Sequence, residues 1–132
     1  MGQQQLLLLV LAAILVGIAV LLGISMFNDN AAQANLDAVI QRCMNLGAQA
    51  QAWYRRPAVM GGGGQNFTGF DLTALGFAAS DTTDDGIFTS AVVGPTSITI
   101  TGTGKEDLNG DGNPLIVTLT VTSNNTSTAV AK

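Results

Sequence analysis

The chain begins with an uninterrupted apolar run and becomes polar only after it. Residues 6–24, LLLLVLAAILVGIAVLLGI, contain no polar side chain, and the first charged residue is Asp29. As a helix with a rise of about 1.5 Å per residue, this run spans about 28 Å, close to the ~30 Å hydrocarbon core of a bilayer. The pattern therefore predicts a helix whose whole circumference is apolar.

The helical pattern does not stop where the apolar run ends. Between residues 29 and 56, apolar side chains recur at spacings of three and four, as in an amphipathic helix. The stripe consists of Leu36, Val39, Ile40, Cys43, Leu46, Ala50, Trp53 and Tyr54. No proline occurs before Pro57, and proline is the residue that most strongly interrupts a helix. One helix of roughly 80 Å, from near Met1 to about Arg55, is predicted.

The remaining residues, 57–132, predict a small β-rich head. GIFTSAVV, TSITITG and PLIVTLTVTS have the composition of strands, and the last two alternate apolar residues with threonine. The Gly94-Pro95 pair predicts a hairpin between the first two strands. The segment 71–86 predicts a short helical turn or an irregular loop, and Gly61–Gly64 a flexible connection. The expected fold class is α+β, with a three- or four-stranded antiparallel sheet packed on the amphipathic half of the helix.

Three interpretations of the apolar run follow from its flanks. A cleavable signal peptide normally has basic residues before a shorter apolar run and a small-residue cleavage site after it, and neither is present here. A transmembrane anchor fits the length, although GQQQ and SMFNDN supply no Lys or Arg to set its topology. In the third interpretation, the apolar run is a surface that packs against copies of the same chain.

The layout of helix and head resembles that of a type IV pilin. In that family a processed N-terminus is followed by a few residues and an aliphatic run of about twenty, and MGQQQLLLLVLAAILVGIAVLLGI matches this layout if Met1 is the mature terminus. The resemblance implies a prepilin peptidase, N-methylation of Met1, residence in the inner membrane, and assembly by pilus machinery into an extracellular homopolymer. The implied filament core is Met1, Gln5, Leu6, Leu7, Leu8, Leu9, Val10, Leu11, Ile14, Leu15, Ile18, Leu21, Leu22 and Ile24.

Two positions depart from the family pattern. Pilins usually carry glutamate at the fifth mature position, where this chain has Gln5. Because an amide cannot neutralise a terminal amine, we expect weaker coupling to that amine, and also a smaller desolvation cost in an apolar core. Many pilins also have a proline near residue 22, where this chain has Leu22 flanked by Gly17 and Gly23. These glycines either allow the helix to stretch or allow neighbouring helices to approach closely.

The composition of the chain argues against several classes of function. The net charge is −4, only 11% of the residues are charged, and histidine is absent. A nucleic-acid binder would need a basic face, and imidazole chemistry and most zinc sites require histidine. Because no nucleophile and base can be assembled from this sequence, we do not expect an enzyme.

One segment has the spacing of a calcium loop. In DLNGDGN, Asp107, Asn109 and Asp111 are two residues apart, as in the first half of an EF-hand loop. The glutamate expected at the twelfth position is missing, because Thr118 occupies it. The alternative is a polar turn between strands, and this is the interpretation that we favour over a Ca²⁺ site.

The other candidate positions are explained by structure or modification. Cys43 lies in the apolar stripe and is expected to be an inert, buried thiol. Asp81, Asp84 and Asp85 are expected in a solvated loop. Asn66, Asn124 and Asn125 each begin an N-x-S/T sequence and are candidate glycosylation sites.

The sequence thus predicts three segments and a structural role. Residues 1–28 form the apolar half of the helix, residues 29–56 its amphipathic half, and residues 57–132 the head. The expected function is that of a pilus-like filament subunit. A minor pilin or secretion pseudopilin, and a membrane-anchored surface binding module, are the alternatives.

Overall fold

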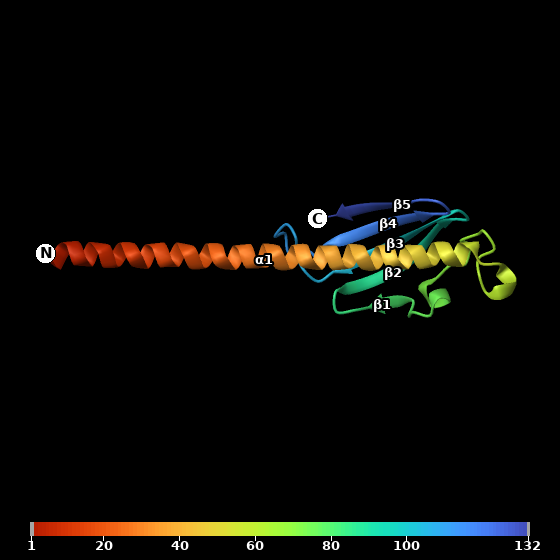
Figure 1. The fold of residues 1–132 in the computed structure, drawn as a ribbon, viewed down its shortest axis with the longest axis horizontal. Helices are drawn as coiled ribbons and strands as arrows, with labels where there is room; N and C mark the ends of the chain where they lie inside the picture. Colours follow the sequence, from red (N-terminus) through yellow and green to blue (C-terminus); the bar gives the residue numbers. More distant parts are fainter. Residues whose placement is uncertain (1, 132) are drawn as a thin grey trace.

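A single long helix dominates the structure. The computed structural model describes residues 2–131, and α1 runs without interruption over Gly2–Arg55. Its first half extends freely beyond the rest of the molecule, and its second half lies along a small sheet (Figure 1). The predicted continuous helix is therefore confirmed. Its apolar composition, the absence of proline and the lack of any strong break explain why both halves continue in one rod.

The head is a sheet with two short 3₁₀ helices before it. The 3₁₀ helices are Ala58–Met60 and Leu72–Leu75. The strands are β1 (Ser80–Thr82), β2 (Gly86–Gly94), β3 (Ser97–Gly104), β4 (Ile116–Thr122) and β5 (Thr126–Ala131). Neighbouring strands pair antiparallel in the order β1-β2-β3-β4-β5, so the sheet is a simple meander beside α1 (Figure 1). The α+β fold class is confirmed.

The prediction of a three- or four-stranded sheet was wrong, because the sheet has five strands within residues 2–131. The three central strands agree with the predicted segments, and the β2–β3 hairpin turns at Gly94-Pro95 as expected. The two edge strands were missed. β1 has only three residues, all of them polar, and β5 reads TSTAVA with every residue exposed. Neither strand has the alternation of apolar and polar residues from which strands are recognised.

The core lies between one face of α1 and one face of the sheet. Val39, Cys43, Leu46 and Ala50 are completely buried on the helix, and Trp53 is nearly so. The sheet contributes the inward side chains Phe88, Ile98, Ile100, Val117, Leu119 and Val121. The predicted stripe is confirmed at these helical positions, while Leu36, Ile40 and Tyr54 lie at its margin and are only partly buried.

Aromatic side chains close the end of the core that is farthest from the N-terminus. Phe67 and Phe70 come from the segment between α1 and the sheet and are buried against the last helical turn. The ring centroids of Trp53 and Phe70 are 5.2 Å apart, and those of Tyr54 and Phe67 are 4.6 Å apart. This cluster was not predicted, because Phe67 and Phe70 lie in a glycine-containing segment without periodicity.

The glycine-rich segment after α1 is not the flexible connection that was predicted. The backbone N–H groups of Gly63 and Gln65 donate to the carbonyls of Trp53 and Tyr54 in the last turn of α1 at 2.9 and 2.7 Å. The N–H group of Gly64 donates to the carbonyl of Arg56, just after the helix, at 2.9 Å. Gly61 and Gly64 have φ values of 78° and 60°, in the left-handed region that glycine adopts most easily. The segment therefore folds back and satisfies the free carbonyls at the helix end.

Candidate functional site

The candidate functional surface is the apolar half of α1. Every residue from 2 to 30 is exposed, and the first buried residue along the helix is Ala32. The large aliphatic side chains between residues 6 and 24 are 48–70% exposed. They are Leu6, Leu7, Leu8, Leu9, Val10, Leu11, Ile14, Leu15, Val16, Ile18, Val20, Leu21, Leu22 and Ile24. No other residue between 2 and 131 covers them.

This half of the helix has the length and composition of a membrane-spanning helix. Its most apolar 18-residue window has a mean hydropathy of 3.2 and is 0% buried, so by length and composition it can cross a bilayer. A contiguous apolar surface of this size is unusual for a protein in water and marks a site of contact with lipid or protein. Both environments replace water by aliphatic contacts.

The residues that depart from the pilin pattern lie on the exposed part of this helix. Gln5 is exposed in the first turns of α1, and Met1, the candidate for N-methylation, lies outside the described residues. The helix passes through Gly17 and Gly23 without a break. A Cβ atom at either glycine would meet nothing within 4 Å. Their small size is therefore not required by contacts of the chain with itself.

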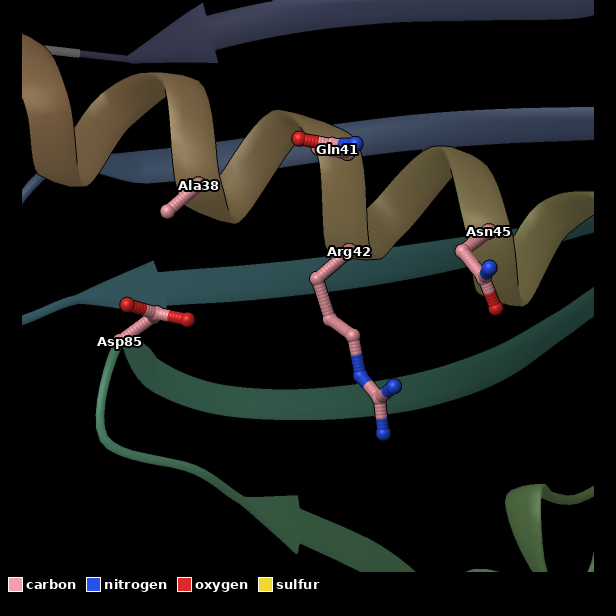
Figure 2. A pocket seen from close by; sticks show the side chains of 5 residues that line it. All are labelled: Ala38, Gln41, Arg42, Asn45 and Asp85. Carbon is pink, nitrogen blue, oxygen red and sulfur yellow. The ribbon is translucent and has the colours of Figure 1, made fainter.

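The second half of α1 is fixed to the sheet edge by an ion pair. Arg42 Nη2 donates to Asp81 Oδ2 at 2.7 Å, and the guanidinium carbon lies 5.0 Å from the ring centroid of Phe77. Figure 2 shows Arg42 extending from α1 across β2, with Asp85 apart from its guanidinium. The prediction that Asp81 lies in a solvated loop was wrong, because Asp81 lies in β1 and its side chain is 15% exposed. Asp84 and Asp85 are exposed as expected.

The segment with calcium-like spacing is a hydrogen-bonded turn between β3 and β4. The Asp107 carboxylate accepts backbone N–H groups of Asn109 and Gly110 through Oδ1 and of Gly112 through Oδ2, at 2.6–3.0 Å. These bonds, that of Gly112 above all, lower the pKa of Asp107. Asp111 accepts the N–H of Asn113 at 2.8 Å. The carboxylates thus support the turn itself.

We expect calcium to leave the stability of the full chain in detergent unchanged, because the Asp107 carboxylate is already used by the turn and no bidentate glutamate is available. The measurement is the melting temperature with millimolar calcium and with a chelator. A ligand present at 100 times its dissociation constant would add about 2.7 kcal/mol. A calcium-dependent rise that Asp107→Asn abolishes would establish a metal site instead.

The single thiol is buried in the core, as predicted. Cys43 has no exposed surface, and burial raises its pKa to about 11. The thiolate is the reactive form. We expect Cys43 in the folded chain at pH 8 to react with iodoacetamide at least about 100-fold more slowly than in denaturant, because the raised pKa reduces the thiolate and burial blocks access. Equal rates in the two states would contradict this packing.

The three candidate glycosylation sites lie on the surface of the head. Asn66 precedes the buried Phe67, and its side chain accepts the N–H of Thr68 at 2.8 Å. Asn125 caps the turn between β4 and β5, where its Oδ1 accepts the N–H of Thr126 at 2.9 Å. Asn124 is exposed in the same turn. All three are accessible, and modification at them stays a prediction.

The architecture is pilin-like, with a long apolar N-terminal helix packed on an antiparallel sheet. In comparisons with protein-family models, curated proteins and solved structures, the chain matches none of them significantly. The inference about function therefore depends on the geometry and chemistry of the chain.

Proposed function

We propose that this protein is the structural subunit of an extracellular, type IV pilus-like filament that polymerises through the apolar half of α1. The observation that carries the proposal is the exposure of all the large aliphatic side chains between residues 6 and 24 on a helix whose other half is packed in a head. A folded head joined to an exposed apolar helix suits a subunit whose helix first lies in a membrane and is later buried among copies of the same chain.

Hydrophobic burial supplies the driving force for such assembly. Removing apolar surface from water contributes about 25 cal/mol per Å², and the side chains of this rod are exposed over more than half of their surface on average. Transfer from lipid into a protein core gives a smaller gain, which depends on close packing of aliphatic side chains. Contacts that repeat head-to-tail without closing produce a fibre.

Gln5 favours one variation of this proposal, a minor pilin or secretion pseudopilin. An amide accepts a hydrogen bond from a terminal amine but leaves its charge in place, so addition of a subunit would be stabilised less than in pilins with glutamate. Such a subunit would occur in short fibres.

A membrane-anchored binding module is the candidate from another class of function. The length and hydropathy of the exposed helix support it, and the threonine-rich outer face of the sheet would then be the binding surface. In this case the apolar rod contacts lipid permanently.

Electron microscopy of surface material sheared from cells that express the chain separates these candidates. Long, uniform fibres that contain this chain are the expected result. Short fibres would favour the minor-subunit variation. Exclusive recovery of the chain in the membrane fraction would contradict filament formation.

A further inference from the structure

The end of the head opposite to the free N-terminus carries two apolar side chains on a fixed loop. Val59 is 99% exposed and Met60 is 73% exposed. The loop does not bend freely, because the N–H groups of Met60 and Gly62 donate to the Pro57 carbonyl and residues 63–65 are bonded to the helix end. Such side chains present apolar area to a partner with little loss of backbone entropy on binding.

Two arginines stand beside these apolar side chains. Arg55 is the last residue of α1 and Arg56 follows it, and both are exposed. Arg55 donates a long hydrogen bond of 3.4 Å to the carbonyl of Ser123, and the only ion pair among residues 2–131 is that of Arg42 with Asp81. We call Arg55, Arg56, Val59 and Met60 the tip. It is an apolar knob with positive charge and no acidic partner in the described part of the chain.

The complementary surface lies where the free half of α1 enters the head. Met26 and Phe27 are 68% and 74% exposed, and Asp29 is exposed next to them. Asp29 and Asp107 line one hollow between α1 and the turn that joins β3 to β4. We call Met26, Phe27 and Asp29 the collar. It pairs apolar side chains with negative charge, the inverse of the tip.

We propose that in the filament the tip of one copy docks on the collar of another copy, so that Val59 and Met60 pack on Met26 and Phe27 while the arginines face Asp29. This inference rests on the proposed function. Asp29 and Arg55, the last residue of α1, are separated along the helix by about 40 Å at 1.5 Å per residue. Two parallel copies shifted by that length along the helix axis therefore bring tip and collar to the same level. The contact is heterologous, and repetition extends it without limit.

Complementary charge gives the contact its register. The apolar rods alone allow many axial offsets, because aliphatic side chains occur along their whole length. Opposite charges at the two ends of the head favour the offset that brings them together, and like charges disfavour others. The filament rise is then determined by the head and the rod together.

Cysteine cross-linking of fibres tests this docking. In the double variant Phe27→Cys with Val59→Cys, we expect a short bis-maleimide to produce a ladder of covalent multimers on a denaturing gel. Each single variant should remain monomeric, because the contact joins different positions. Both positions are largely exposed, so folding is unaffected, and Cys43 is buried. Phe27→Cys with Thr89→Cys, which is exposed in the middle of β2, is the matched control and should give no ladder.

The outcomes separate this inference from the proposed function. Fibres of the double variant that stay uncross-linked, or a ladder of equal length in the Thr89 control, would overturn the docking while filament formation stands. Failure of the unsubstituted chain to form fibres would count against the proposed function.

Charge reversal provides a second measurement that needs no cross-linker. Arg56→Asp and Asp29→Arg should each reduce fibre yield about tenfold, and their combination should restore it. Unchanged yields in both single variants would also overturn the docking.

Discussion

Leu15→Asp should reduce fibre formation to an undetectable level. Leu15 lies in the middle of the apolar half of α1 and is 59% exposed in the single chain. In a filament core each copy would bury an unpaired carboxylate, at a cost of several kcal/mol. At the centre of a membrane-spanning helix, the same charge costs about 2.5–3.5 kcal/mol on translocon-insertion scales. The measurement is the amount of fibre sheared from cells, counted by electron microscopy against total chain.

Two comparisons make this result specific. Leu15→Met keeps volume and apolarity and should form fibres in normal amounts. The melting temperature of the head should be the same in both variants, because Leu15 contacts nothing in the head. Normal fibres from Leu15→Asp would contradict burial of this part of the helix.

Gly102→Val should destabilise the head by at least about 3 kcal/mol, at the upper end of the cost of overpacking. Gly102 lies on the inward face of β3, and even a Cβ atom there would be 2.8 Å from the Cys43 Sγ atom and from side-chain carbons of Val39 and Phe88. Those neighbours are fully buried and cannot move away. We expect the melting temperature of the full chain in detergent to fall by about 15 °C.

Thr101→Val is the matched control, since it places the same side chain one residue earlier on the other face of β3. Because Thr101 is only half-buried, we expect a change within about 0.5 kcal/mol. A similar melting temperature for Gly102→Val and the original chain would show that the helix and the sheet are not as close as described.

The rod and the central strands were predictable because their patterns are long and regular. The helix follows from apolar residues without a break and then from spacings of three and four, and β3 and β4 follow from Ile, Val and Leu alternating with threonine. The two edge strands, β1 and β5, do not have such a regular apolar pattern. β5 has no buried face that would reveal a period of two. β1 is stabilised by pairing with β2 and by the ion pair of Asp81 with Arg42, two residues that are 39 positions apart in the sequence.

The structure of the segment after the helix is harder to predict from local sequence than the helix itself. Pro57 predicts where α1 stops, but the return of residues 63–65 to its last carbonyls depends on the buried Phe67 and Phe70, which hold the loop against Trp53. The residues of the tip are close together in sequence, but the exposure of Val59 and Met60 is known only from the structure. The candidate functional surface, the apolar half of α1, is in contrast evident from the sequence alone.

A structure of the chain in its assembled form, by electron cryo-microscopy of the fibres, tests the central claim most directly. The quantity to measure is the exposed area of Leu6–Ile24. We expect these side chains, 48–70% exposed for the large aliphatic ones in the single chain, to be buried almost completely against the same stretch of neighbouring copies. An assembly in which they contact lipid or detergent and no other copy would contradict the account.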